Sequence, residues 1–167
     1  NILVNTILIA SAFYLFFVTL RDFFIKKYKN LAQNIAHFGF SLLILSILFN
    51  NLLSTEIITN LKVGETYDDS KTKIVFESID QENQKNYKAI IANFSILNSN
   101  GANDNLSPEL RVYNQPKITT SEADIQTTLM KDKFIVINLV QNQDYFNVRY
   151  QVKPFMLWIW FSVIIIS

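Results

Sequence analysis

Cysteine is absent from this 167-residue chain, and histidine occurs once, at position 37. Without cysteine the chain has no disulfide, no thiol relay and no thiolate metal site. With one histidine, a Ser-His-Asp or Cys-His arrangement can form only around His37. No HExxH, glycine-rich phosphate loop or EF-hand pattern occurs. We therefore expect no catalytic residue in this chain. If it takes part in catalysis, its role is to bind, position or hold a cofactor.

Charge is also missing, from two long runs at residues 1–20 and 31–55, and the mean hydropathy is high at +0.18. About 20 apolar residues cross the roughly 30 Å hydrocarbon layer of a membrane. We therefore predict transmembrane helices over 1–20 and 31–53, an inner loop over 21–30, and the start of a third helix over 154–167. Core helices of a soluble protein and, for the first run, a cleavable signal peptide are the alternatives. The chain starts without Met, and we expect it to be one piece of a larger polypeptide.

The inner loop is assigned by its charge, with Arg21, Lys26, Lys27 and Lys29 against Asp22 alone. Basic loops stay in the cytoplasm or, for a mitochondrial inner membrane, in the matrix. Residues 54–153 then form a domain in the periplasm or the intermembrane space. This segment has 11 Lys and Arg against 13 Asp and Glu, so it offers no basic field for nucleic acid.

The outer domain is predicted to be β-rich. Residues 146–152 alternate apolar and polar side chains, the period-2 pattern of a half-buried strand. Residues 73–79, 89–97 and 134–140 are further candidates because they are apolar and β-branched. The polar stretch 98–107 indicates a loop, and Thr119 with Glu122 fits a capping box for a short helix reaching Met130. The fold class is thus transmembrane helices, two complete and one partial, flanking a small β-rich domain.

His37 is the candidate site residue because an ionisable side chain inside a membrane is costly and usually has a function. Imidazole is a good axial ligand for haem iron. Small neighbours, Ala36 and Gly39, allow a helix or a flat macrocycle to approach closely. From the residues alone a haem ligand, a proton relay and a neutral packing histidine all remain open.

Several segments, in order, resemble the C-terminal part of the CcmF family, haem lyase membrane subunits of cytochrome c maturation. These segments are Ala36-His37-Phe38-Gly39, Pro108-Glu109-Leu110-Arg111-Val112-Tyr113, residues 119–125, Asp132-Lys133-Phe134 and Lys153-Pro154-Phe155 with Trp158-Ile159-Trp160. The resemblance covers almost the whole chain and implies a subunit of a haem lyase that is not active alone.

The resemblance implies that His37 is one of two axial ligands of a membrane haem b, with Gly39 beside the cofactor. It also implies partners: the N-terminal part of CcmF, the haem chaperone CcmE, a CcmH-type thiol-handling protein and apocytochrome c. The family's tryptophan-rich segment and its two outer histidines are missing here. The membrane is a bacterial or mitochondrial inner membrane, crossed several times.

Arg111 has two interpretations, because arginine pairs bidentately with carboxylates. With Tyr113 it contacts haem propionates or a partner carboxylate, or it forms an internal ion pair that orders the domain. Trp158 and Trp160 are expected in the interfacial aromatic belt. The alternative to the whole reading is a non-catalytic, membrane-anchored β-domain that docks a partner protein, with His37 packing only.

Overall fold

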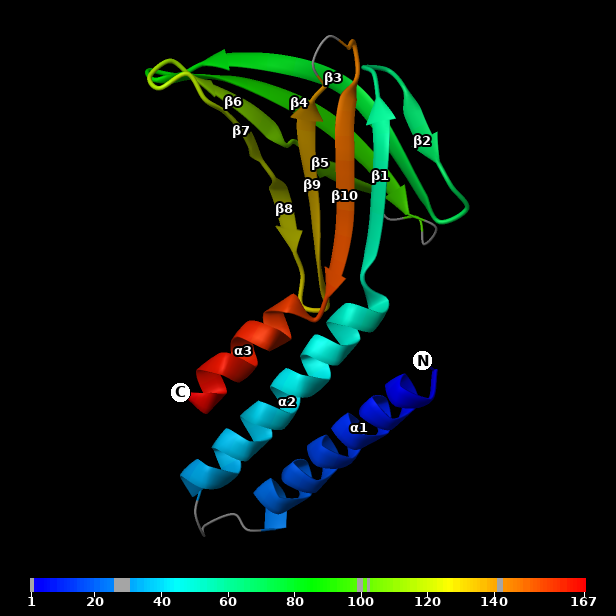
Figure 1. Cartoon of the computed structure of the whole chain (residues 1–167), viewed down its shortest axis with the longest axis vertical. Helices are drawn as coiled ribbons and strands as arrows, with labels where there is room; N and C mark the ends of the chain where they lie inside the picture. Colours follow the sequence, from blue (N-terminus) through cyan, green and yellow to red (C-terminus); the bar gives the residue numbers. More distant parts are fainter. Residues whose placement is uncertain (1, 26–30, 99–100, 102, 141–142) are drawn as a thin grey trace. The chain divides into compact units, whose positions relative to one another are not determined.

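The computed structural model describes residues 2–25, 31–98, 101, 103–140 and 143–167 (Figure 1). The chain divides into two compact units. The helical unit comprises Asn1–Ser54, Thr127–Asp132 and Lys153–Ser167, and the β unit comprises Thr55–Gln126 and Lys133–Val152. The predicted inner-loop lysines Lys26, Lys27 and Lys29 lie outside the described residues.

Three helices make up most of the helical unit: α1 (Ile2–Ile25), α2 (Leu31–Leu53) and α3 (Met156–Ile166). Within α1 and α2, Thr6–Ile25 and Leu31–Leu53 are long and apolar enough to cross a membrane. A helix rises 1.5 Å per residue, so the 23 residues of α2 span about 34 Å. α1 continues past the predicted end at residue 20, through Arg21 and Asp22, to Ile25.

The turn into α3 is built around Phe155, which has a left-handed backbone conformation with φ 61°. Its ring packs against Phe49 of α2 at a centroid distance of 5.2 Å. Asn50 Nδ2 donates a hydrogen bond of 2.6 Å to the carbonyl of Pro154. These contacts attach the first turn of α3 to the last turns of α2.

The β unit consists of two sheets. One has the order β1-β10-β9-β8; the other has the order β2-β3-β4-β6-β7, with β5 also paired to β4. The strands are β1 (Thr55–Leu61), β2 (Thr66–Asp68), β3 (Thr72–Asn83), β4 (Tyr87–Asn98), β5 (Asn103–Leu106), β6 (Glu109–Tyr113), β7 (Thr119–Glu122), β8 (Asp124–Thr127), β9 (Lys131–Leu139) and β10 (Phe146–Pro154). The predicted β-rich domain is confirmed.

A single apolar core fills the space between the two sheets. Phe76 of β3 and Phe94 of β4 stack with their ring centroids 4.4 Å apart, and both are almost fully buried. From the other sheet, Ile135, Ile137 and Val148 are fully buried. Along β9 the fully buried residues occupy alternate positions, as on the inner faces of sandwiches generally.

The helix predicted from Thr119 to Met130 is wrong. Residues 119–122 and 124–127 form β7 and β8, and β7 pairs with β6 in antiparallel register. The Thr120 hydroxyl donates to the carboxylate of Glu122 two residues on, both on the same side of the strand. The stretch 98–107 is likewise only partly loop, because β5 pairs with β4 and buries Leu106.

Candidate functional site

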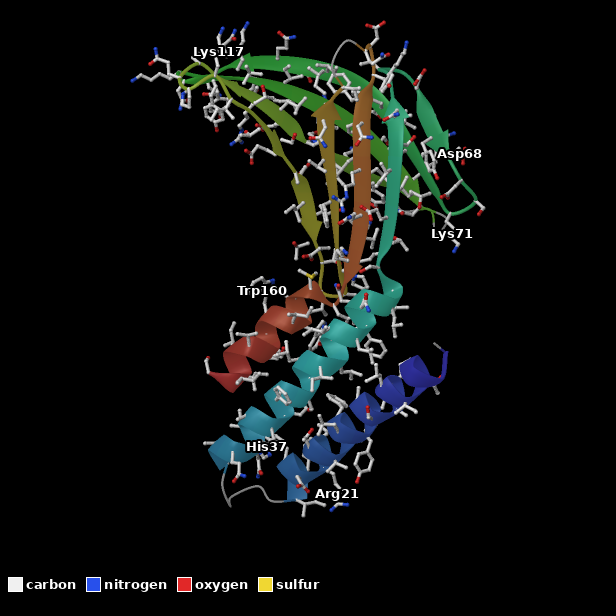
Figure 2. All side chains as sticks on the ribbon, in the orientation of Figure 1. Arg21, His37, Asp68, Lys71, Lys117 and Trp160 are labelled. Atoms are coloured by element: carbon white, nitrogen blue, oxygen red, sulfur yellow. The ribbon has the colours of Figure 1, made fainter. Side chains whose placement is uncertain are left out.

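His37 lies in the second turn of α2, and its side chain is exposed (Figure 2). Four other exposed residues of α2 share its side of the helix at intervals of three, four or seven residues: Gln33, Phe40, Ile47 and Asn51. This spacing is that of one continuous face of a helix. Within the described residues, the imidazole has no hydrogen-bonding or charged partner. We call this set of five residues the open face of α2.

α1 covers a second side of α2. Ser41, one turn after His37, is fully buried and shares a hydrogen bond of 2.7 Å with Thr19 of α1. Phe38 packs against Phe16 and Phe23 at centroid distances of 5.7 and 6.1 Å. Although Ser41 and His37 are four residues apart, only Ser41 lies in the contact between the helices.

α3 covers a third side of α2, and Gly39 marks the contact. A Cβ at position 39 would lie 2.7 Å from Cγ2 of Ile165 and 3.0 Å from Cγ1 of Ile166. At 2.7 Å the Ile165 side chain, or the backbone that carries it, would have to shift to admit a larger residue at position 39. Successive helical residues turn by about 100°, so positions 37 and 39 point to nearly opposite sides. The small residue beside His37 therefore serves the packing of α2 against α3.

Arg111 lies in the β unit, on β6, and already has partners there. Its Nε donates a hydrogen bond of 2.9 Å to Glu109, and its guanidinium lies 5.2 Å from the centroid of the Tyr87 ring. The Tyr87 and Tyr113 rings are themselves 5.2 Å apart. The hydrogen bond to Glu109 raises the pKa of Arg111 above its usual value. The internal ion pair anticipated for this arginine is therefore present.

A buried polar cluster in the sandwich was not anticipated from the sequence. The ammonium of Lys133 on β9 pairs with Asp104 on β5, and both side chains are less than a tenth exposed. Asn98 Nδ2 donates a further hydrogen bond of 2.9 Å to Asp104. The hydroxyl of Tyr150 is buried and has no hydrogen-bond partner among the described residues. Burial raises the pKa of Tyr150 to about 12, and the charge of Asp104 adds to this shift.

One signal does point to this cluster. Lys133, Ile135 and Ile137 occupy alternate positions of one strand, so they share a face. The two isoleucines are core residues, which places the lysine inward as well. A buried lysine normally requires a paired charge, but the sequence does not say which carboxylate supplies it.

The chemistry available to the described residues is limited. They contain no group of three or more His, Cys, Asp or Glu that could hold a metal ion. The adjacent acids Asp68 and Asp69 belong to an exposed turn, where Asp68 pairs with Lys73 and Asp69 accepts backbone hydrogen bonds from Lys71 and Thr72. These bonds lower the pKa of Asp69. His37 is the single histidine of the chain, and imidazole is a common axial ligand of haem iron.

Comparison with known proteins gives a consistent set of matches. Residues 52–154 match the protein-family model described as the CcmF C-terminal beta-sandwich. The chain is 27% identical over 126 residues to the cytochrome c-type biogenesis protein CcmF of Haemophilus influenzae, covering 75% of this chain and 19% of that protein. Against CcmF of Escherichia coli it is 25% identical over 125 residues, again 75% and 19% of the two chains.

A solved structure of the cytochrome c heme lyase CcmF superposes with a TM-score of 0.66 at 14% identity, covering 99% of this chain and 33% of that one. At this identity the likeness concerns the fold, and it extends over helices and sandwich alike. The chain spans about a fifth of the length of the CcmF relatives it matches.

Proposed function

The chain belongs to the CcmF C-terminal β-sandwich family, and from that premise we propose that it forms the C-terminal portion of a cytochrome c haem lyase. A role in cytochrome c biogenesis follows from the family and the relatives. In our proposal this portion helps to hold a membrane haem b and supports covalent attachment of haem to apocytochrome c. It acts with the N-terminal part of CcmF, the haem chaperone CcmE and a CcmH-type protein.

We assign His37 as an axial ligand of the haem iron. The observation that carries this is its exposure on the open face of α2, while α1 and α3 occupy the other sides. An imidazole hydrogen-bonded inside the α1–α2 contact would be explained by packing, as Ser41 is. An imidazole without a partner among the described residues requires one from outside these helices if α2 spans a membrane, since ionisable groups in membranes are costly.

The C-terminal part of the open face adjoins a groove. A groove of about 560 Å³ lies between α1 and α2 and includes Ile47 and Asn51 of the open face with Tyr14 of α1. Tyr14 is 73% exposed, so this side of the helix pair is uncovered in the chain by itself. A second histidine on another helix of the complete protein would complete the ligand pair.

His37 lies about 9 Å along α2 from Leu31, since six residues at 1.5 Å separate them. In this proposal the basic loop is inside, and His37 would hold a haem in the inner half of the membrane. A bound haem b supplies a one-electron redox centre. His37 would hold the iron, and Phe40 on the same face would offer an apolar contact to the macrocycle.

Gly39 and Arg111 have supporting roles in this proposal. Gly39 sets the approach of α3 to α2 and so fixes the helix that carries His37. Arg111 orders the β6 side of the sandwich through Glu109 and Tyr87. The sandwich lies in the periplasm or the intermembrane space, and the membrane is a bacterial or mitochondrial inner membrane.

The test is a visible spectrum of the purified native complex after reduction with dithionite. In His37→Gly, we expect the low-spin b-type bands to be lost and then restored by added imidazole, which replaces the missing ligand. Gln33→Ala, an exposed polar residue on the same face, is the matched control and should leave the bands unchanged. Unchanged bands in His37→Gly would refute the assignment and favour a docking module in which His37 only packs.

A further inference from the structure

A hydrogen bond between two hydroxyl groups joins α1 to α2 about one turn from His37. The hydroxyl oxygens of Thr19 and Ser41 lie 2.7 Å apart. Ser41 is fully buried and Thr19 is half-buried. Each hydroxyl also lies within hydrogen-bonding distance of a carbonyl of its own helix, at 2.9 Å from Phe16 for Thr19 and 2.8 Å from Phe38 for Ser41. The two side chains are therefore held to their own backbones as well as to each other.

The neighbouring contacts between α1 and α2 are aromatic. The Phe38 ring packs against Phe16 and Phe23 with its plane tilted by 41° and 34° to theirs. Burial of apolar surface is non-directional, so these rings hold the helices together but tolerate rotation of α2 about its axis. A hydroxyl–hydroxyl bond is directional and requires an oxygen–oxygen distance of about 2.5–3.0 Å. It therefore specifies the rotation that the rings leave free.

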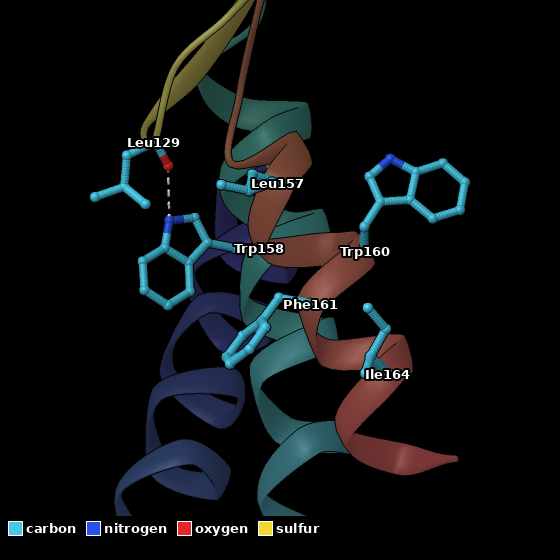
Figure 3. Close-up of a pocket in the computed structure, with 6 residues that line it drawn as sticks. All are labelled: Leu129, Leu157, Trp158, Trp160, Phe161 and Ile164. Carbon is cyan, nitrogen blue, oxygen red and sulfur yellow. Dashed lines mark hydrogen bonds between the residues drawn. The ribbon is translucent and has the colours of Figure 1, made fainter.

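α3 restrains α2 in a different way. The contact of Gly39 with Ile165 limits how closely the two helices approach. The indole N–H of Trp158, in the first turn of α3, donates its hydrogen bond to the carbonyl of Leu129 and not to α2 (Figure 3). This side of α2 thus contributes a limit on distance beside His37.

A second polar contact of α2 is remote from His37. Asn50 Nδ2 bonds the carbonyl of Pro154, but Asn50 follows His37 by 13 residues, which is about 20 Å along a helix. Ser41 follows His37 by four residues, or about 6 Å. Of the two contacts, the one at Ser41 therefore controls the orientation of the turn that carries the imidazole.

The size of the effect follows from helix geometry. Cα atoms lie about 2.3 Å from the helix axis and the outer ends of side chains about 5–6 Å from it. A rotation of α2 by about 15° would move the exposed end of His37 by about 1.5 Å and a hydroxyl closer to the axis by about 1 Å. A shift of about 1 Å is enough to break a hydrogen bond. Functional groups have to be held within about 0.5 Å and 10–20° of their working geometry, so the bond has the tolerance that a metal ligand needs.

We propose that Thr19 and Ser41 are positioning residues for His37. Their hydrogen bond fixes the rotation of α2 and so the direction in which the imidazole leaves the open face. This inference rests on the proposed role of His37 as an axial ligand. Neither hydroxyl would touch the haem, since both act through the backbone of α2. Without the bond the helices would stay paired through Phe38, and the imidazole would be held less firmly in one orientation.

The test is electron paramagnetic resonance of the oxidised native complex, because the g values of low-spin ferric haem depend on the orientation of its axial imidazole planes. Thr19→Val keeps the shape of the side chain without the hydroxyl, and we expect it to keep the haem but shift the g values. Ser41→Ala should produce the same shift, and the double variant should add nothing to it. Thr19→Ser, which keeps the hydroxyl, should match the parent. Ser46→Ala removes another buried serine of α2, one that lies beside Phe155 and Trp158, and should also match the parent.

The outcomes separate this inference from the proposed function. Parental g values in both Thr19→Val and Ser41→Ala, with the haem bands lost in His37→Gly, would overturn the positioning role and leave the ligand assignment intact. An equal shift in Ser46→Ala, or loss of haem in Thr19→Ser as well as in Thr19→Val, would show a general packing effect and also overturn it. Haem bands that persist in His37→Gly would overturn the ligand assignment and the positioning role together.

Discussion

The buried pair of Lys133 and Asp104 gives a prediction with a calculable size. In Asp104→Ala, the Lys133 ammonium would remain in the core without its counter-charge, and Asn98 would lose an acceptor. Removing one member of a buried ion pair typically costs about 3–5 kcal/mol. A small domain has only about 5–15 kcal/mol of stability in total. We therefore expect Asp104→Ala to remove a large part of the stability of the sandwich.

A double variant distinguishes two causes of the loss of stability: the missing attraction between the charges and the burial of one charge without its partner. Replacing both partners with apolar residues, as in Asp104→Leu with Lys133→Met, removes the pair and its desolvation cost together. Such replacements are often neutral or stabilising by about 1–4 kcal/mol. The double variant should thus be at least as stable as the parent, although each single change is strongly destabilising.

The assay is amide hydrogen exchange of β4 and β9 in the complete complex, where protection reports the free energy of opening. A loss of 3 kcal/mol corresponds to roughly a hundredfold faster exchange, since 1.4 kcal/mol is about tenfold. Exchange in Asp104→Ala within about threefold of the parent would refute the reasoning. So would a double variant as unstable as the sum of the single ones.

The other predictions concern the same cluster and the helix contacts. Tyr150→Phe removes a buried hydroxyl that has no partner, so we expect a gain of about 1 kcal/mol in thermal unfolding. Folding raises the pKa of Tyr150 from 10 to about 12. As the pH rises, the folded protein therefore loses this proton at a higher pH than the unfolded chain does. The stability from this shift is complete below pH 10 and lost between pH 10 and 12, and the phenylalanine variant should not show this loss. Gly39→Val should lower the stability by about 1–3 kcal/mol, because the larger side chain overpacks against Ile165, and Gly39→Ala should lower it less. Equal thermal stability of the parent and both variants would contradict this contact. Ser41→Ala should cost about 0.6 kcal/mol, typical of hydrogen bonds between membrane helices, and adding Thr19→Val should cost little more because the bond of 2.7 Å is already lost.

Local pattern was enough to predict the helices and four strands. The uncharged runs identify α1 and α2 because few soluble segments lack charge for so long. The alternation at 146–152 identifies β10 because side chains of a strand point alternately to its two faces. His37 needed no pattern, since a lone ionisable residue in an apolar run is conspicuous.

Non-local pairing explains what the pattern missed. The Thr119–Glu122 sequence satisfies a capping box, but its pairing with β6 makes it a strand, as tertiary context often overrides local preference. The partner of Lys133 lies 29 residues earlier in the chain, and no periodicity links the two. Gly39 has a small side chain for a reason that becomes visible only when Ile165 is placed beside it.

The pairing of β1 with β10 has a consequence for how this protein could change over time. Thr55 and Val152, at the two ends of the β unit, are direct partners in the register, and such partners lie about 5 Å apart. The sandwich is therefore an insertion whose entry and exit meet at one point, the arrangement in which whole domains are most readily gained, lost or exchanged. Between these ends the chain returns once to the helical unit, at Thr127–Asp132, so a change of the sandwich that preserves the helical unit has to keep this loop. The strands of the β unit can thus diverge while this loop and the helix that carries His37 are kept.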